Sequence, residues 1–243
     1  MPPRKNSIKD KIIRRLRRIT SGRKIAIHGR YGLELAIDPE IVSPRITEEI
    51  RRGTYESLES AHILSAVQPT DHVLELGAGL GFIASLIQTS KPVAQYTAVE
   101  ANPKLIPLIK ETLRINNAKV EVINAIASTL PEEIAIGSVP FVVEPEFWAS
   151  RKGGQGDRVK AIDFNALIKE RGISLIIVDI EGGEADLFQY ADLKGVRRIC
   201  VEIHPDIGKA KIQRLFETLH RLDFVYDGRT SIGTVVMFAR EVA

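Results

Sequence analysis

Two short acidic segments carry the side chains whose types and spacing could perform chemistry. Asp179 and Glu181 stand two residues apart after the apolar run 175–178. Glu202 and His204 have the same spacing at the end of a second apolar run. Residues two apart share one face of an extended strand, so the four groups would converge if the two runs are neighbouring strands. Because histidine ordinarily titrates near pH ~6.5, the pattern predicts that His204 is a general base and that Asp179 orients the substrate or the imidazole.

Other interpretations of these side chains stay open at this point. His204 can instead be a strand-end histidine that bonds to the backbone. Glu181 completes the predicted catalytic set, and with Asp179 and His204 it could hold a divalent metal, although we do not favour a metal. Glu184 is predicted to contact the substrate, or alternatively to stabilise the first turn of a helix.

A glycine-rich turn at residues 77–81 follows an apolar strand and precedes a helix. Free N–H groups at a helix N-terminus, reached over bare glycine backbone, bind nucleotide cofactors in such folds. The dinucleotide fingerprint G-x-G-x-x-G/A does not fit, because Phe82 stands at its last position and Gly81 comes one residue early. With Glu75 at the strand end, the spacing is similar to motif I of S-adenosylmethionine-dependent methyltransferases.

Acidic and amide residues near this turn suit the parts of S-adenosylmethionine. Glu75 would bind the cationic amino group, or would serve only as a structural carboxylate for its own turn. Glu100, at the end of the next strand, would accept hydrogen bonds from a ribose diol, or would be a helix-start acid. Asn124 is expected beside the adenine, although asparagine is also a common turn residue. The predicted cofactor-binding residues are Tyr55, Glu56, Glu75, Gly77, Ala78, Gly79, Gly81, Phe82, Glu100, Ala101, Asn102, Asn124 and Ala125.

Alternating strands and helices must position these groups. Five βα units followed by a hairpin predict an α/β fold with a Rossmann-like doubly wound sheet, in the class I methyltransferase order 3-2-1-4-5-7-6 with one antiparallel strand. Asn102 is expected to cap a helix with Pro103 at its first position, and Asp163 or Asn165 to begin another. The expected strands are 72–76, 95–99, 120–123, 175–178, 198–203, 224–226 and 234–238.

Residues 1–45 are predicted to be an appendage to a catalytic domain that spans 46–243. Within the appendage, residues 4–20 place isoleucines and a leucine at helical spacing among arginines, which indicates a basic amphipathic helix. This helix could cap the domain, lie on an anionic membrane surface or contact an anionic partner such as nucleic acid.

A β-hairpin over 24–28 and 33–38 is expected next. A helix over 46–67, interrupted by a glycine, would follow it. Tyr55 and Glu56 lie at this interruption, where they could close over the cofactor or simply pack against the domain.

A long insertion over 125–165 is the candidate substrate region. It contains an expected strand at 139–143 and an expected mobile loop at 148–157. Trp148, Ser150 and Arg151 are predicted substrate contacts, since tryptophan can stack on a sugar face and arginine can bind phosphate or carboxylate bidentately.

Composition and charge narrow the function classes. The 243 residues are 44% hydrophobic, enough for one large α/β domain with its own core. The single cysteine, Cys200, excludes an internal disulfide and a multi-cysteine zinc site. No run approaches the ~20 apolar residues that span a membrane, and no secretory signal is seen. We therefore expect a cytoplasmic protein, with peripheral attachment at the inner membrane face through residues 4–20 as an option.

The net charge of +3 is unevenly distributed. Residues 1–24 carry +9, which leaves −6 for the remainder, so the body of the chain gives no sign of a nucleic-acid surface. Nucleic acid is therefore not favoured as a partner, and the oligomeric state is left open; a small-molecule, glycan or glycolipid acceptor is what the resemblance described next implies.

Three segments together resemble the FkbM-type methyltransferase family: 74–82, 99–103 and 178–184, the last similar to its D-x-E-G-x-E signature. Residues 159–167 and 201–204 are similar to the flanking strands of that family, and the resemblance covers about residues 50–240. Glu75 departs from the aspartate of many members but keeps the charge. The resemblance implies O-methylation of a hydroxyl on a sugar, a glycolipid or a related natural product, for example fucose on a lipo-chitooligosaccharide nodulation signal.

Rival functions can be separated by particular features. A ribose methyltransferase acting on RNA would use the basic arm, whereas base amino methylation is disfavoured because residues 179–182 lack the Pro-Pro-aromatic pattern of such enzymes. A cofactor-binding protein without catalysis would bind S-adenosylmethionine and turn over no acceptor. An NAD-dependent oxidoreductase is disfavoured by Phe82.

Overall fold

A seven-stranded sheet forms the centre of the computed structural model, which describes residues 24–144, 146, 149–204 and 207–240. The spatial order is β12-β13-β11-β10-β3-β4-β5, and the pairs are parallel except those that involve β13. The predicted order with one antiparallel strand is confirmed, and the sheet has the class I methyltransferase fold. The strands are β3 His72–Leu76, β4 Gln95–Glu100, β5 Glu121–Asn124, β10 Leu175–Val178, β11 Arg198–Glu202, β12 Phe224–Tyr226 and β13 Val235–Arg240.

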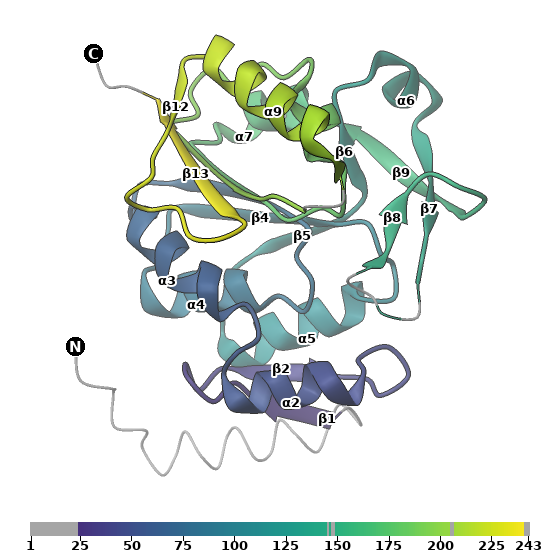
Figure 1. The fold of residues 1–243 in the computed structure, drawn as a ribbon. Helices are drawn as coiled ribbons and strands as arrows, with labels where there is room; N and C mark the ends of the chain where they lie inside the picture. Colours follow the sequence, from purple (N-terminus) through teal and green to yellow (C-terminus); the bar gives the residue numbers. More distant parts are fainter. Residues whose placement is uncertain (1–23, 145, 147–148, 205–206, 241–243) are drawn as a thin grey trace.

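Helices cover both faces of this sheet (Figure 1). Because alternate side chains of a strand point to opposite faces, the buried residues divide between two cores. Val73 and Ile177 belong to the core beneath the first group of helices, and Leu74 and Ile176 belong to the other core. The first group is α3 Ser57–Ala66, α4 Phe82–Ser90 and α5 Ile106–Asn116, and the second is α7 Phe164–Arg171, α8 Glu184–Phe188 and α9 Lys209–Arg221.

Local signals set the beginnings of two helices. Asp163 caps α7, since its carboxylate accepts hydrogen bonds from two backbone N–H groups of the first turn, as predicted. The prediction for Asn102 is wrong by about one turn, because α5 begins only at Ile106. The Asn102 side-chain oxygen instead accepts a hydrogen bond from the Lys104 N–H, and the proline in the first turn of the helix is Pro107.

The N-terminal hairpin is confirmed as a separate two-stranded sheet. β1 Lys24–Ile27 and β2 Glu34–Ile37 pair antiparallel, and the Ala36 N–H donates to the Thr112 hydroxyl of α5 at 3.0 Å. The chain then forms α2 Pro44–Arg52, which ends at Gly53 in the left-handed conformation (φ 75°) before α3 begins. His28 joins the hairpin to this junction, because its Nε2 bonds to the Tyr55 carbonyl at 3.0 Å.

The insertion after β5 forms a second, four-stranded sheet with the order β6-β9-β7-β8. The expected strand at 139–143 is β7, but the mobile loop expected over 148–157 is wrong in part, because β8 pairs with β7. A Cβ at Gly156 would lie 1.9 Å from the Phe141 carbonyl oxygen, so this glycine permits two backbones to approach closely. The elements are β6 Ile126–Ser128, α6 Pro131–Ile136, β7 Ser138–Val142, β8 Arg151–Lys152 and β9 Asp157–Asp163.

A buried ion pair joins the amino ends of the central strands. Arg197, just before β11, donates to both carboxylate oxygens of Asp71, which precedes β3. The Asp71 side chain is 2% exposed and also accepts a hydrogen bond from the Ser174 hydroxyl at 2.7 Å. These contacts hold the starts of β3, β10 and β11 together, at the opposite edge of the sheet from the strand ends described below.

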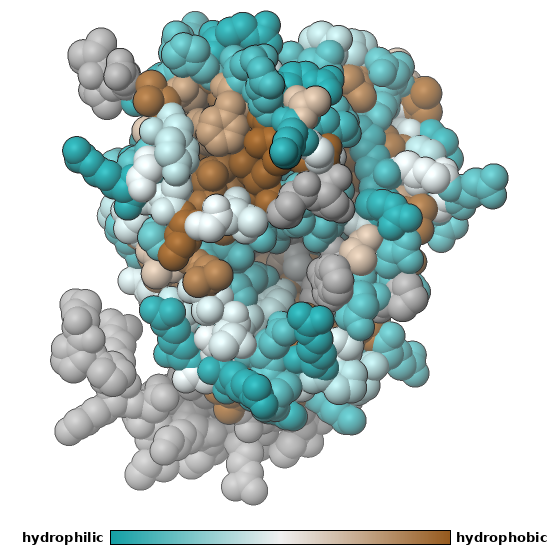
Figure 2. Space-filling view, viewed as in Figure 1, coloured by the Kyte–Doolittle hydropathy of each residue, from teal (hydrophilic) through white to brown (hydrophobic). Residues whose placement is uncertain are grey.

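On the face shown in Figure 2, apolar side chains gather over β12, β13 and α9 among a mainly polar surface. Val225 and Tyr226 of edge strand β12 are exposed. Within the described ranges, no helix combines the length and the apolar character that crossing a membrane requires. The basic helix predicted at 4–20 and Trp148 lie outside the described residues.

Candidate active site

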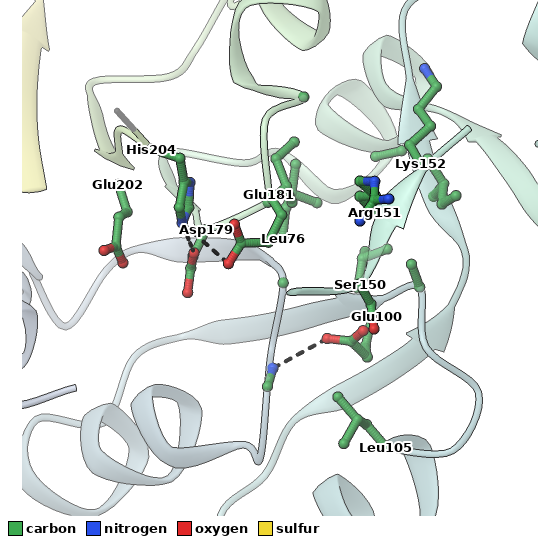
Figure 3. A pocket seen from close by; sticks show the side chains of 18 of the residues that line it. Leu76, Glu100, Leu105, Ser150, Arg151, Lys152, Asp179, Glu181, Glu202 and His204 are labelled. Carbon is green, nitrogen blue, oxygen red and sulfur yellow. Dashed lines mark hydrogen bonds and ion pairs between the residues drawn. The ribbon is translucent and has the colours of Figure 1, made fainter. Parts of the chain in front are cut away.

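A cleft of about 330 Å³ opens at the carboxyl ends of β3, β4, β10 and β11. Doubly wound α/β folds bind their ligands at this edge. The insertion sheet supplies the facing wall (Figure 3). The predicted site residues that line the cleft are Tyr55, Glu56, Gly77, Gly79, Glu100, Ala101, Ala125, Ser150, Arg151, Asp179, Glu181 and His204.

Glu100 ties the glycine turn to the end of β4. Its Oε2 accepts a hydrogen bond from the Gly79 N–H at 3.2 Å, and its Oε1 accepts one from the Asn102 N–H at 2.8 Å. Burial raises the pKa of Glu100 to about 7, although these backbone donors offset part of the effect. A carboxylate held at this strand end is placed to accept hydrogen bonds from the two hydroxyls of a ribose.

The junction between α2 and α3 covers the glycine turn. Gly79 has a φ of 51°, and a Cβ there would lie 3.2 Å from the Tyr55 hydroxyl oxygen and 3.5 Å from Oε1 of Glu56. Glu56 itself has a positive φ of 47°. Burial raises the pKa of Glu56 well above its ordinary range, with a further contribution from the charge of Glu59. Tyr55 and Glu56 therefore lie where a ligand on the turn would be enclosed.

Glu75 and Phe82 lie beside the cleft rather than in it. Glu75 lines a small cavity on the α3 side of the sheet, together with Glu59 and Asp179. Burial raises the pKa of Glu75 to about 8, and its Oε2 has no hydrogen-bond partner among the described residues. The prediction that Phe82 contacts the cofactor is wrong, because α4 buries its ring completely against the ring of His28, with 4.5 Å between the centroids.

Four other predicted cofactor contacts support the site from behind and do not line the cleft: Ala78, Gly81, Asn102 and Asn124. The Asn124 side-chain N–H₂ donates to the carbonyl oxygens of Glu100 at 2.8 Å and Ala101 at 3.0 Å. This amide therefore fastens the end of β5 to the end of β4, and the predicted contact of its N–H₂ with adenine gives way to a structural role.

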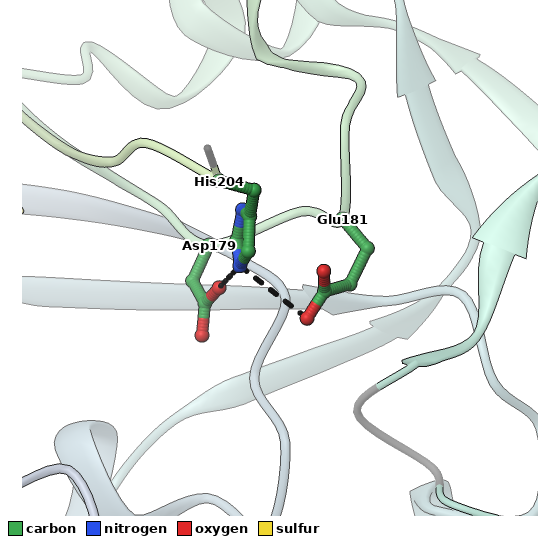
Figure 4. A group of neighbouring side chains, drawn as sticks. All are labelled: Asp179, Glu181 and His204. Carbon is green, nitrogen blue, oxygen red and sulfur yellow. Dashed lines mark ion pairs between the residues drawn. The ribbon is translucent and has the colours of Figure 1, made fainter. Parts of the chain in front are cut away.

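The opposite end of the cleft, hereafter the acidic end, consists of Asp179, Glu181, Glu202 and His204. β10 and β11 are parallel neighbours with Val178 opposite Val201, so the two pairs converge as their spacing predicted. Nε2 of His204 lies 3.3 Å from Oε1 of Glu181 and 3.6 Å from Oδ1 of Asp179 (Figure 4).

Burial and mutual charge set the protonation of the acidic end. Burial raises the pKa of Asp179 to about 8, and the charge of Glu202 contributes in the same direction. Burial alone would lower the pKa of His204, but hydrogen bonds to Glu181 and Glu184 outweigh it and raise that pKa to about 11. An imidazole in this state carries a proton on both nitrogens at neutral pH. The carboxylates around both nitrogens thus favour the protonated imidazole in the free protein, and the role of general base for His204 stays a prediction.

Glu184 lies behind the imidazole and cannot touch a substrate. Its side chain is fully buried, and its Oε1 accepts a hydrogen bond from Nδ1 of His204 at 2.6 Å. The prediction of a substrate contact is wrong because the chain turns at Gly182, with a φ of 81°, and α8 begins with Glu184 directed into the interior.

The insertion sheet forms the facing wall from polar and basic side chains. Arg151 pairs with Glu144 at 2.8 Å, and Lys152 pairs with Glu133 at 2.6 Å. Ser150 is buried and its hydroxyl accepts a hydrogen bond from the Glu144 N–H, so it shapes the wall. Figure 3 shows the two basic side chains across the cleft from the acidic end.

The sequence did not single out Glu59 or Lys152. Glu59 stands on α3, and burial together with the charge of Glu202 raises its pKa to about 8. Nothing in the local sequence links a helix before β3 to strand ends more than a hundred residues later. Glu202 was visible in the spacing of β11 but was not included in the predicted catalytic set.

The residues present fit S-adenosylmethionine. The glycine turn offers backbone N–H groups beside Glu100, and the cofactor has two cationic groups, its amino group and its sulfonium. Oε2 of Glu75 is buried without a hydrogen-bond partner among the described residues, and burial raises the pKa values of Glu75 and Asp179, so their ionised forms lack a stabilising partner in the free protein. A cationic ligand would offset that charge.

Comparison with known proteins gives matches to methyltransferases. A family model described as methyltransferase small domain matches residues 58–145, which include the glycine turn and Glu100. The malonyl-[acyl-carrier protein] O-methyltransferase of Anoxybacillus flavithermus is 32% identical over 88 residues, which are 33% of this chain and 33% of that protein. The chain thus matches about a third of the length of this relative. These findings support an S-adenosylmethionine-dependent methyltransferase.

Solved structures with similar folds include the following two, both of low sequence identity. A methyltransferase from Pyrococcus furiosus has a TM-score of 0.48 and 12% identity, with 97% of this chain and 100% of that chain covered. TYW2 from M. jannaschii in complex with AdoMet has a TM-score of 0.47 and 13% identity, with 91% and 89% covered.

The family match corrects the resemblance to the FkbM-type family, because methyltransferase small domain is a different family. The carbohydrate acceptors that only this resemblance implied, including nodulation signals, therefore have no support. Glycine turns of this kind occur in many methyltransferase families, and residues 178–184, which carried most of the resemblance, lie outside the matched range.

Proposed function

We propose that this chain is an S-adenosylmethionine-dependent methyltransferase that methylates a hydroxyl group of a small-molecule acceptor. One observation carries the proposal: a single cleft joins the glycine turn and Glu100 to the acidic end. The family match supports the methyl donor. The acidic end supports a hydroxyl acceptor, because a hydroxyl must lose a proton when it is methylated and carboxylates can accept that proton.

Residues around the glycine turn would hold the cofactor. Glu100 would accept hydrogen bonds from the ribose, and Tyr55 and Glu56 would cover the turn and exclude water. When bound, S-adenosylmethionine supplies a methyl group on a positively charged sulfur. The buried Glu75 and the acidic end would attract its cationic groups, because opposite charges interact strongly where water is excluded.

The acidic end and the insertion sheet would position the acceptor. Methyl transfer is an in-line displacement, so the acceptor oxygen must stand behind the methyl carbon, and such alignment can supply about 7–11 kcal/mol of the barrier. The two walls of the cleft restrict where that oxygen can lie. Arg151 and Lys152 would contact the part of the acceptor that is remote from the reacting hydroxyl.

Glu202 is the best-placed acceptor for the hydroxyl proton. It lines the cleft beside Asp179, and among the described ion pairs it has none with His204. Its Oε1 accepts a hydrogen bond of 3.4 Å from the Thr234 hydroxyl, which keeps the carboxylate at the rim of the cleft. Glu202 would take the hydroxyl proton, and the electron pair of the O–H bond would stay on the acceptor oxygen; the cofactor, when bound, would supply the methyl group and keep the electron pair of its broken carbon–sulfur bond.

Calorimetry with S-adenosylmethionine and, separately, NAD⁺ tests the cofactor end. We expect binding of S-adenosylmethionine alone. Glu100→Gln should weaken it by about tenfold or more, since charge-assisted hydrogen bonds contribute about 1.5–3 kcal/mol. Glu121→Gln on neighbouring strand β5 is the matched control, because its exposed carboxylate pairs with Arg171 away from the cleft. Binding of NAD⁺ but not S-adenosylmethionine would overturn the proposal.

Transfer of a labelled methyl group to a panel of hydroxyl, amine and RNA acceptors tests the reaction. We expect turnover of a small hydroxyl compound, and in Glu202→Gln a loss of about 10²–10⁴-fold in kcat measured at saturating cofactor. RNA is the second candidate, favoured by the +9 charge of residues 1–24. Turnover of RNA that is lost when residues 1–23 are removed would support that candidate instead. Cofactor binding with no turnover of any acceptor would indicate a protein without catalysis.

A further inference from the structure

Three donor atoms of different chemistry meet at the acidic end. One donor atom from each of Asp179, Glu181 and His204 lies within 4.8 Å of the other two. The two distances from Nε2 are 3.3 Å and 3.6 Å. Two donors that bind one cation at about 2.1 Å are about 3.0 Å apart at a right angle and about 3.4 Å apart in a tetrahedral arrangement. The two distances from Nε2 are therefore close to those of donors that share one cation, and the two carboxylates lie within reach of the same point.

The imidazole is set in place from its other side. Oε1 of Glu184 holds Nδ1 of His204 at 2.6 Å, so Nε2 is directed toward the two carboxylates, as Figure 4 shows. Glu184 is fully buried, and its Oε2 has no hydrogen-bond partner in the part of the chain that the structure describes. A carboxylate behind a histidine is the usual support of a metal-binding imidazole, because it fixes both the ring and the nitrogen that faces the metal.

The excess of carboxylates at the acidic end also favours a bound cation. Glu59 and Glu202 lie beside Asp179 in the adjoining small cavity, so the carboxylates outnumber the single imidazole. Arg151 and Lys152, the basic side chains across the cleft, are already paired with Glu144 and Glu133 on their own wall.

The geometry points to a divalent-cation site formed by Asp179, Glu181 and His204, with Glu184 as the positioning residue behind the imidazole. Two carboxylate oxygens and one imidazole nitrogen suit a transition-metal dication such as Mn²⁺ or Zn²⁺ rather than Mg²⁺, which prefers oxygen ligands throughout. The remaining coordination positions face the cleft. Building on the proposed function, this cation would bind the acceptor oxygen and favour its deprotonation. His204 would then serve as a ligand through Nε2, which gives up its proton to the solvent when the cation binds.

Binding of Mn²⁺ to the full chain, without cofactor or acceptor, tests the site. The probe is Mn²⁺ alone, and the readout is loss of the electron paramagnetic resonance signal of the free ion as protein is added. We expect one bound Mn²⁺ per chain. Asp179→Asn and Glu181→Gln should each weaken binding by at least tenfold. Glu184→Gln should weaken it about 10–100-fold, since residues behind a ligand have effects of that size.

Asp186→Asn is the matched control, because Asp186 lines the same cleft but its carboxylate pairs with Lys211. It should bind Mn²⁺ like the unmodified chain, and circular dichroism would show that each variant is folded. An unchanged free Mn²⁺ signal with unmodified protein would overturn the site, as would equal weakening in Asp186→Asn and Asp179→Asn. Calorimetry with S-adenosylmethionine on the same samples tests the proposed function independently. Cofactor binding without Mn²⁺ binding would overturn only the metal site, and Mn²⁺ binding without cofactor binding would overturn only the proposed function.

Discussion

Gly77 should be the position of the glycine turn at which even alanine disrupts the fold. It lies at the end of β3, with a φ of 83°, directly against the end of β10. A Cβ there would lie 1.7 Å from the Asp179 carbonyl oxygen, which is backbone and cannot swing away like the end of a side chain. Real Cβ atoms almost never approach another heavy atom closer than 3.0 Å, so the two hydrogen-bonded strands would have to move apart by about 1.3 Å.

The expected loss of stability in Gly77→Ala follows from three contributions. A non-glycine residue in the left-handed region costs about 1–2 kcal/mol. Separating the strand ends weakens the hydrogen bond from the Asp179 N–H to the Leu76 carbonyl, now 2.9 Å long, and this loss is worth about 1 kcal/mol. Overpacking adds about 1–3 kcal/mol. Together these give about 3–6 kcal/mol, or a fall in melting temperature of roughly 6–24 °C for a chain of this size.

Gly79→Ala is the comparison that makes the assay decisive. Gly79 also has a positive φ of 51°, but the nearest atoms to its Cβ would be the side-chain ends of Tyr55 and Glu56 at 3.2 Å and 3.5 Å. We expect a loss of only about 1–2 kcal/mol, together with at least tenfold weaker binding of S-adenosylmethionine. Differential scanning calorimetry and cofactor titration measure both quantities. A Gly77→Ala variant that melts no lower than Gly79→Ala would refute the steric reasoning.

Two further predictions concern buried carboxylates. Asp71→Asn should lower stability by about 1.5–3 kcal/mol, because it removes charge-assisted hydrogen bonds to Arg197, whose side chain is 30% exposed and stays partly solvated. Burial tends to raise the pKa of Asp71, but Arg197 and its other donors hold it below the ordinary value. The contribution is therefore present above pH ~3.9 and is lost as the pH falls below it. Acid titrations of both proteins followed by circular dichroism should therefore converge at low pH, and parallel curves would contradict the assignment. Burial keeps the Glu75 proton on the folded protein to about pH 8, whereas the unfolded chain loses it near pH ~4.3, so the melting temperature of the unmodified protein should fall as the pH rises from 5 to 8. Glu75→Gln should reduce this fall. An identical pH dependence in both proteins would show that the carboxyl is not buried as described.

The central sheet could be predicted because its determinants are local. The run 175–178 is apolar throughout, which is typical of a strand buried on both faces, and it forms β10 in the middle of the sheet. The pairs after β10 and β11 converge because parallel strands end at a common edge, a consequence of topology rather than of fine detail. The three glycines of the turn all adopt positive φ, as tight turning at the end of β3 requires.

The insertion could not be predicted to the same depth, because its strands are short and pair at a distance in the sequence. β8 has only two residues, and it exists through pairing with β7 rather than through a propensity of its own. The roles of individual residues in the site also could not be predicted from the sequence. The spacing showed that Glu181 and His204 would meet, but only the buried position of Glu184 reveals that the imidazole is held from behind.

The protonation of His204 shows why residue type alone could not assign the chemistry. An isolated histidine titrates near pH ~6.5 and is a natural base, so the sequence favoured that role. In the folded chain three carboxylates stand within 3.6 Å of its two nitrogens, and each stabilises the charged ring. The same carboxylates thus favour the protonated imidazole in the free protein at neutral pH. In the proposed function a cleft of this composition would hold cations, whether the sulfonium of the cofactor or a metal ion, and Glu202, which has no described ion pair with the imidazole, would take the proton.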